Sequence, residues 1–274
     1  MTYLEAAFMG LVQGLTEFLP VSSSAHLRIA GFLFPGVGDP GAAFTAIVQI
    51  GTELAVVIYF WNDIRKIALA WFRQMGGRDH DRQDARLGWL VVAGSVPIVV
   101  LGLVFQDLIE TSLRNLYITA ATLIGFGLVL GLCDRLGRRT RTLTNMTWKD
   151  GMIFGFAQAM ALIPGVSRSG GTISAGLAMG YTRETAARYS FLLAIPAVFG
   201  SGFYQLWSSW DEPGVGLAAT ATATVVSFAI GYVVIAVFLR MISTMSFFPF
   251  VIYRVVLGIL LLMLLWTGMI PATA

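Results

Sequence analysis

The chain has 274 residues, of which 57% are hydrophobic and only 12% are charged, and its formal net charge is +3. Soluble domains carry roughly 45–50% apolar and about 25% charged residues, so this chain cannot cover a folded surface with polar groups. With a mean hydropathy of +0.76, the composition predicts an integral membrane protein and excludes a soluble enzyme, a disordered chain and a nucleic-acid-binding domain. The single cysteine excludes a disulfide framework, and two histidines argue against a histidine-rich metal site.

In chain order, the first apolar stretch is 4–34, and three stretches long enough to cross a bilayer follow at 44–61, 87–105 and 116–133. A second long stretch at 150–180 is again followed by three spans, at 186–206, 217–239 and 250–268. Stretches 4–34 and 150–180 are each interrupted near the middle by proline, serine or glycine, in Leu19-Pro20-Val21-Ser22-Ser23-Ser24 and in Pro164-Gly165-Val166-Ser167-Arg168-Ser169-Gly170-Gly171. Non-helical backbone at membrane depth is tolerated only inside protein or beside a water-filled cavity. We therefore expect two re-entrant helical hairpins in addition to six transmembrane helices.

The basic residues predict the orientation of these spans, because loops on the cytoplasmic side are enriched in lysine and arginine. The 62–86 loop carries six basic residues, the 134–149 loop carries five, and Arg183, Arg188 and Arg240 lie on the same side. The opposite loops, 106–115 and 207–216, hold only Arg114. We expect the two basic loops to be cytoplasmic and both termini to lie on the outer face.

An internal repeat appears when the second interrupted stretch is shifted by 145 residues onto the first. The shift superimposes Ser23 on Arg168 and three identical pairs, which are Gln13 on Gln158, Ser22 on Ser167 and Ser24 on Ser169. Each repeat holds one hairpin and three spans, and because three is odd the second repeat must be inverted. We predict an all-α polytopic membrane protein with a single domain over 1–274, built from inverted repeats at about 1–135 and about 146–274. Ser23 and Arg168 should then lie close together at the repeat interface.

Ionisable groups inside membrane spans are costly and are functional by default. Gln13 and Glu17 share one helical face, and Ser22, Ser23 and Ser24 stand where the next half-helix begins, at a dipole end that attracts anions. His26 follows on the face of Ser23. A hydroxyl, an imidazole and a carboxylate at a helix N-terminus are the groups used in nucleophilic phosphoryl transfer. The alternative is that the serines only cap the helix and His26 only bonds across helices.

The second break adds groups that suit a phosphate ligand. Arg168 can grip phosphate oxygens in bidentate fashion, Gly170 lets backbone approach a ligand closely, and Ser167, Ser169 and Thr172 add donors. The alternative is a structural ion pair between Arg168 and Glu17.

Three further charged residues remain open. Glu53, midway along a span, either serves the cavity or pairs with an arginine. For Arg254, snorkelling toward the cytoplasm is the main interpretation and contact with the ligand is the lesser one. Arg28 is also interpreted as snorkelling.

These motifs resemble those of a known family. Gln13-Gly14-Leu15-Thr16-Glu17-Phe18-Leu19-Pro20-Val21-Ser22-Ser23-Ser24-Ala25-His26 is similar to the first motif of the undecaprenyl-diphosphate phosphatases, or bacitracin-resistance proteins. The second motif is similar to Pro164-Gly165-Val166-Ser167-Arg168-Ser169-Gly170-Gly171-Thr172-Ile173-Ser174, and Gln49-Ile50-Gly51 and Pro249-Phe250-Val251-Ile252-Tyr253-Arg254 also fit. The family has Glu or Gln at position 13; a glutamine cannot act as a base, which shifts that role to Glu17 and His26. Glu53 is not part of the family pattern.

The resemblance implies hydrolysis of the C55 polyprenyl diphosphate to the monophosphate and phosphate on the outer face of the bacterial plasma membrane. This reaction recycles the lipid carrier for peptidoglycan synthesis and lowers sensitivity to bacitracin. It also implies a six-span inverted-repeat fold and assistance by Mg²⁺ or Ca²⁺, for which Glu17 is the candidate ligand. By motif, Ser23 corresponds to the nucleophile and Glu17 and His26 to the acid/base groups. The expected substrate-binding residues are Arg168, Gln13, Ser22, Ser24, Ser167, Ser169, Gly170, Thr172 and Arg254.

The competing hypothesis is a transporter or flippase of an anionic polyprenyl lipid, because inverted repeats with broken helices are typical of transporters. A nucleophile with acid/base partners at one helix break favours the enzyme. The expected partners are the lipid substrate and the bilayer, without nucleic acid. The sequence leaves the oligomeric state open, including a homodimer.

Overall fold

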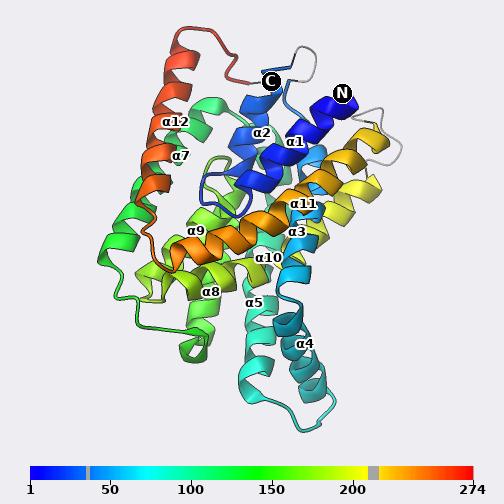
Figure 1. Cartoon of the computed structure of the whole chain (residues 1–274), viewed down its shortest axis with the longest axis vertical. Helices are drawn as coiled ribbons and strands as arrows, with labels where there is room; N and C mark the ends of the chain where they lie inside the picture. The colour runs from blue at the N-terminus through cyan, green and yellow to red at the C-terminus, as the bar shows by residue number, and fades with distance from the viewer. Residues whose placement is uncertain (35–37, 209–215, 274) are drawn as a thin grey trace.

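The computed structural model describes residues 1–34, 38–208 and 216–273, and within these ranges the regular structure is helical apart from one isolated bridge between Arg141 and Tyr181. In the described ranges, six helices are long and apolar enough to cross a membrane: α3 (Gly41–Tyr59), α5 (Arg82–Val104), α7 (Leu116–Leu136), α10 (Arg183–Ser208), α11 (Leu217–Ile242) and α12 (Phe248–Trp266). They coincide with the six predicted spans, with ends that differ by a few residues. Figure 1 shows them as one helical bundle with both termini at the same end.

The outer surface of this bundle is apolar. Only 28% of the most apolar 18-residue window is buried in α11 and in α12, and side chains such as Leu103, Val237 and Val256 are more than half exposed. A soluble monomer rarely exposes contiguous apolar surface on this scale. The six helices therefore have the surface of a protein whose exterior is solvated by lipid.

Both predicted helix breaks are present. The first separates α1 (Tyr3–Thr16) from α2 (Ser23–Gly31), and the second separates α8 (Trp148–Ala159) and the short 3₁₀ helix η2 (Met160–Leu162) from α9 (Arg168–Ala178). The residue before each second half-helix, Ser22 or Ser167, has a φ of 73° or 71°. Non-glycine residues rarely occupy this left-handed region, and such strain clusters at functional sites.

The predicted 62–86 loop is wrong in one respect, because most of it is helical. Helix α4 (Trp61–Met75) directly continues from α3, and α5 already begins at Arg82. Ile64 and Ile67 pack on the core, while Arg65 and Lys66 are exposed, so the helix is amphipathic. The charged residues made its helical spacing of apolar residues hard to recognise in the sequence. In Figure 1, α4 lies at the end of the molecule opposite the two termini.

The remaining predicted loops hold little regular structure. The 106–115 loop contains the short helix α6 (Gln106–Glu110), and the 134–149 loop contains the 3₁₀ helix η1 (Leu143–Asn145). Of the predicted 207–216 loop, residues 209–215 lie outside the described residues.

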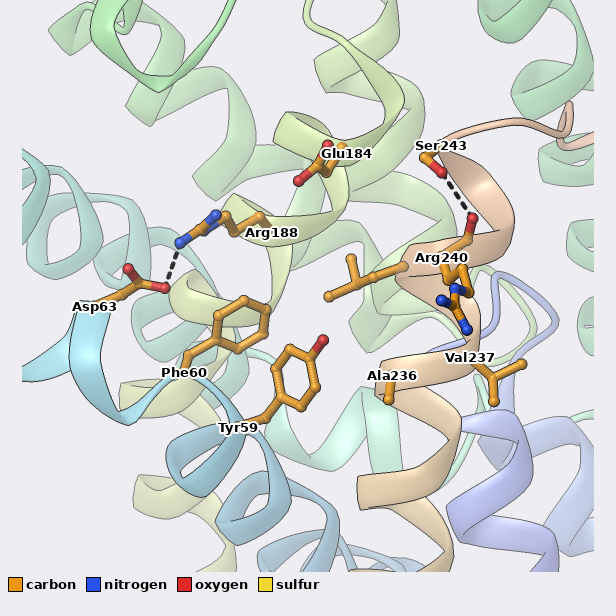
Figure 2. Close-up of a pocket in the computed structure, with 10 residues that line it drawn as sticks. Tyr59, Phe60, Asp63, Glu184, Arg188, Ala236, Val237, Arg240 and Ser243 are labelled. Atoms are coloured by element: carbon orange, nitrogen blue, oxygen red, sulfur yellow. Dashed lines mark hydrogen bonds and ion pairs between the residues drawn. The ribbon is translucent and has the colours of Figure 1, made fainter.

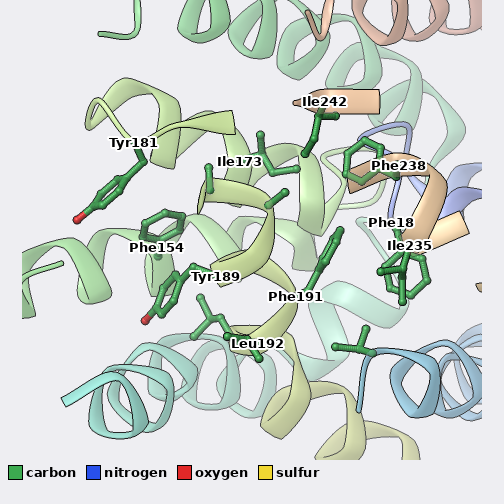
Figure 3. Packing of buried hydrophobic residues seen from close by; sticks show 14 of the residues in the cluster. Phe18, Phe154, Ile173, Tyr181, Tyr189, Phe191, Leu192, Ile235, Phe238 and Ile242 are labelled. Atoms are coloured by element: carbon green, nitrogen blue, oxygen red, sulfur yellow. The ribbon is translucent and has the colours of Figure 1, made fainter. Parts of the chain in front are cut away.

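Helix α10 forms the centre of the bundle. Its residues Tyr189, Phe191 and Leu192 are buried among aromatic and branched side chains from α8, α9 and α11, as Figure 3 shows. On one side of this core, α11 contacts both α1 and α3. These contacts are very close: a Cβ added at Gly10 would lie 2.3 Å from Ala223 O, and one at Gly51 would lie 2.1 Å from Thr224 O. Small residues allow such backbone approach between membrane helices, and here they bring the C-terminal end of α1 next to the middle of α3.

Candidate active site

The Glu17 carboxylate lies at the centre of the site, directly after α1, and is almost fully buried. One oxygen, Oε2, accepts hydrogen bonds from Gln13 Nε2 at 2.7 Å, Ser23 Oγ at 2.6 Å and Gln49 Nε2 at 3.3 Å. The other, Oε1, accepts from Arg168 Nη2 at 2.8 Å. One carboxylate thus joins α1, α2, α3 and α9.

Ser23 is the first residue of α2 and is half-buried. Its hydroxyl donates to Glu17, so it does not cap the helix. The N-cap residue Ser22 makes no side-chain cap hydrogen bond either; its hydroxyl lies 3.2 Å from Ser24 Oγ. The first N–H groups of a helix lack intrahelical partners and carry the positive end of its dipole. The capping alternative is therefore wrong for Ser22 and Ser23, and the N-terminus of α2 keeps its capacity to bind an anion.

His26 lies beside Ser23 but bonds elsewhere. Its Nδ1 lies 2.8 Å from Ser22 O, and its Nε2 lies 2.6 Å from the Tyr253 hydroxyl of α12. The two rings are stacked, with centroids 5.5 Å apart and an interplanar angle of 9°. The sequence left Glu17 and His26 open as the general base. The hydrogen bond of Ser23 favours Glu17.

Arg168, the first residue of α9, meets Ser23 at the same carboxylate, as the repeat predicts. Its Nη2 also lies 3.8 Å from Glu53 Oε2, while its Nη1 is buried without a hydrogen-bond partner among the described residues. The ion pair with Glu17 that the sequence offered as an alternative is present. It uses one guanidinium nitrogen and leaves another available.

The other polar residues of the second break hold the two breaks together. Ser167 Oγ accepts from Gly170 N at 3.2 Å and so caps α9. Ser169 Oγ donates to Leu19 O at 3.1 Å, and Thr172 Oγ1 donates to Arg168 O at 2.7 Å. Their hydroxyl donors are used within the protein, and contact between these residues and a substrate stays a prediction.

Arg254 does not snorkel, because its side chain is fully buried. Its guanidinium donates to five backbone carbonyls around the two breaks and on α7, those of Leu123, Pro20, Thr122, Gly165 and Val166. The helix breaks leave carbonyls without helical partners, and one arginine with five N–H donors satisfies several of them. The predicted substrate contact of Arg254 remains a prediction that these bonds do not support. Arg28 does not snorkel either: it is buried and pairs with Asp39 at 2.9 Å.

Two residues that the sequence did not assign to the site, Gln49 and Tyr253, lie in it, and so does Glu53, whose role the sequence left open. Gln49 and Glu53 come from α3, and Tyr253 comes from α12. Gln49 and Glu53 are four residues apart, the same spacing as Gln13 and Glu17. Two polar residues on one face of an otherwise apolar span were the signal for α3, and for Tyr253 the only signal was its place in the motif at 249–254.

No group of three or more His, Cys, Asp or Glu side chains suited to a metal ion occurs among the described residues. Two carboxylates, Glu17 and Glu53, nevertheless lie within 4 Å of the same Arg168 nitrogen. Both oxygens of Glu53 are buried without a hydrogen-bond partner in the described part of the chain. Carboxylate oxygens are the ligands that Mg²⁺ and Ca²⁺ prefer, so these residues fit a divalent cation.

A separate cavity of about 680 Å³ lies at the end of the molecule that carries α4. Figure 2 shows it between α3, α10 and α11, with Arg188 paired to Asp63 on one side and Arg240 on the other. It shares no residue with the cluster around Glu17. The predicted site residues lie elsewhere, at the two helix breaks.

Fold and site together define a class: helical membrane proteins in which a hydroxyl, a carboxylate and a guanidinium meet at two helix breaks. The chain matches the bacitracin resistance protein BacA family over residues 6–260. It is 66% identical over 274 residues to undecaprenyl-diphosphatase 2 of Agrobacterium fabrum, with 99% of each chain covered. It is 59% identical to the undecaprenyl-diphosphatase of Paenarthrobacter aurescens and 60% identical to that of Pseudarthrobacter chlorophenolicus, covering 99% of this chain and 100% of each relative. The chain belongs to the BacA family and is a multi-pass membrane protein.

Proposed function

We propose that this protein hydrolyses undecaprenyl diphosphate to undecaprenyl phosphate and inorganic phosphate, which recycles the lipid carrier for peptidoglycan synthesis and confers bacitracin resistance. Full-length relatives named for this activity support the proposal. The observation that carries it is the hydrogen bond of Ser23 Oγ to Glu17 Oε2 at 2.6 Å, with Arg168 on the other oxygen of that carboxylate. These are a nucleophile, a base and an anion-binding group in contact.

Ser23 Oγ attacks the terminal phosphorus, and the bond from that phosphorus to the bridging oxygen breaks. Glu17 takes the hydroxyl proton as the new O–P bond forms. Undecaprenyl phosphate leaves with the bridging oxygen. Water then attacks the phosphoserine, the O–P bond to Ser23 breaks, and a proton returns to Ser23 as phosphate departs.

Arg168 links binding to this proton transfer. In the structure it pairs with Glu17, the proposed base. A phosphate that draws the guanidinium away binds to it through charge-assisted hydrogen bonds and removes the donor that Glu17 Oε1 has in the structure. The N–H groups at the start of α2 stabilise the charge that develops on the phosphoryl oxygens.

His26 and Tyr253 form the exposed flank of the site, since Tyr253 is 46% exposed. They are placed to contact the diphosphate from the side of α12. A divalent cation, Mg²⁺ or Ca²⁺, would be held by Glu17 and would supply charge neutralisation for the diphosphate.

The two interrupted segments are proposed as re-entrant hairpins of an inverted repeat. Ser22 and Ser167, 145 residues apart, share a left-handed backbone and the same contact to the serine two residues later, each 3.2 Å. Helix packing has the same symmetry: α1 contacts α11 as α8 contacts α5, and α3 contacts α11 as α10 contacts α5. The excess of basic residues supports cytoplasmic 62–86 and 134–149 segments and termini on the outer face.

Phosphate release from undecaprenyl diphosphate by the purified protein in detergent, with Mg²⁺, tests the proposal. Wild type should turn over, and Ser23→Ala should lose activity while still binding the lipid. Arg168→Ala should lose both activity and most of the binding. If wild type binds the lipid and releases no phosphate, the transporter hypothesis replaces the phosphatase. Activity that survives in Ser23→Ala would instead move the attack to water or another hydroxyl.

A further inference from the structure

Glu53 is the one charged residue of the site without a role in the reaction described above. It lies midway along α3 with a fully buried side chain. Neither of its oxygens accepts a hydrogen bond from any described residue, and its nearest cation is Arg168, at 3.8 Å. Because an uncompensated carboxylate inside a membrane protein is costly, such a residue normally marks a functional site.

An ion pair with Arg168 does not account for Glu53. The guanidinium nitrogen closest to Glu53 is already bonded to Glu17 at the shorter distance of 2.8 Å. A bound proton would neutralise the carboxyl but leave its O–H without an acceptor, because none is within hydrogen-bond distance among the described residues. What both oxygens lack is a positively charged ligand.

The charges of the site lead to the same requirement. When both are ionised, Glu17 and Glu53 present two negative charges to the one guanidinium that contacts them, that of Arg168. The proposed substrate adds the negative charges of a diphosphate, which must enter beside these carboxylates. One further cation of charge two would offset the excess of the carboxylates and leave one positive charge toward the entering phosphate.

We propose that Glu53, together with Glu17, binds the divalent cation of this enzyme. Because residue 13 is a glutamine, the segment around the first break brings one carboxylate to the site, that of Glu17. Glu53 supplies the second carboxylate from α3. The Gln13 amide donates to Glu17, and its own oxygen, Oε1, is buried without a partner among the described residues. It is a further oxygen beside Glu17. Mg²⁺ is typically held by one or two carboxylates with substrate oxygens and water, which matches this set.

The test uses Mn²⁺ as the probe and the full-length protein in detergent, without substrate. The loss of the free Mn²⁺ signal in electron paramagnetic resonance gives the dissociation constant. Wild type should bind one Mn²⁺, and Glu53→Gln should weaken the affinity by about tenfold or more, the scale seen when groups that support a metal are removed. Glu53→Asp, which keeps the charge, should retain part of the affinity. Glu184→Gln, an exposed carboxylate of α10 outside the site, is the matched control and should bind as wild type.

The inference also predicts the kinetics of Glu53→Gln. The Mg²⁺ concentration for half-maximal phosphate release should rise by about tenfold or more, while kcat at saturating Mg²⁺ changes much less. Equal Mn²⁺ affinity in wild type and folded Glu53→Gln, checked by size-exclusion profile, would overturn the inference. So would turnover by a wild type that binds no Mn²⁺, and in that case the proposed function stands. The inference rests on the proposed function only for what the bound cation is used for. Mn²⁺ binding that depends on Glu53, without phosphate release, would therefore support the cation site and contradict the phosphatase activity.

Discussion

Glu17 receives hydrogen bonds from four side chains. These bonds hold the carboxylate beside the Ser23 hydroxyl. Arg168 is the donor that a phosphate would attract, so substrate binding and activation of Ser23 depend on one residue. His26, by contrast, is held by Tyr253 and by the Ser22 carbonyl, away from the Ser23 hydroxyl.

At this scale, we expect Glu17→Gln to lower kcat for phosphate release by about 10²–10⁴-fold, the range for loss of a general base. His26→Gln should have a smaller effect and act mainly on KM, because His26 faces the exposed flank. Glu5→Gln, which keeps its helix cap at the start of α1, is the control. Steady-state kinetics at saturating Mg²⁺ distinguish them, and a larger kcat loss in His26→Gln than in Glu17→Gln would make His26 the base.

Among the elements, the two broken segments depend on Arg254 of α12. Pro20 belongs to the first break and Gly165 and Val166 to the second, and the carbonyls of all three accept hydrogen bonds from Arg254. The buried charge is tolerated because every part of the guanidinium has an acceptor. This single side chain fixes the distance between the N-termini of α2 and α9.

We therefore expect Arg254→Met, which has similar length and no donors, to destabilise the protein by several kcal/mol, since each unsatisfied buried carbonyl costs about 1–3 kcal/mol. Arg240→Met, an exposed arginine of α11, is the matched control and should change stability by less than about 0.5 kcal/mol. Thermal unfolding in detergent, followed by tryptophan fluorescence, measures both. Equal Tm values for the two variants would show that the carbonyl contacts of Arg254 contribute little.

On the scale of the whole molecule, the two ends differ in their content of basic residues. Both termini lie at one end, and α4, with its basic residues, lies at the other (Figure 1). The proposed orientation puts the terminal end outside, where bacitracin and the diphosphate product of cell-wall synthesis would be met.

Because Cys133 is the only cysteine, the orientation is open to a direct labelling experiment. In a Cys133→Ala background, Thr273→Cys at the terminal end should react with a membrane-impermeant maleimide in intact cells. Asp79→Cys, between α4 and α5, should react only after permeabilisation. The reverse pattern would contradict the orientation derived from the basic residues, and activity of both variants would show that the fold is retained.

Residues close in sequence were predicted well. The six spans, the two breaks and the Gln13–Glu17 pair all follow from local hydropathy, proline and helical spacing, which act within about 20 residues. The amphipathic helix α4 was taken for a loop because its charges, such as Arg65 and Lys66, dominate its composition. The repeat further predicted that Ser23 and Arg168 lie close together, and they share one carboxylate.

The sequence by itself determined that this is an integral membrane protein, how many transmembrane spans it has and which residues lie at its two helix breaks. Only the tertiary structure decided that Gln49 and Glu53 join the site, that His26 turns to Tyr253 and that Arg254 holds backbone carbonyls instead of reaching water. These outcomes depend on how α3 and α12 pack against the breaks. Packing is set by close contacts between segments distant in sequence, such as Gly51 against Thr224, and local patterns carry no information about them.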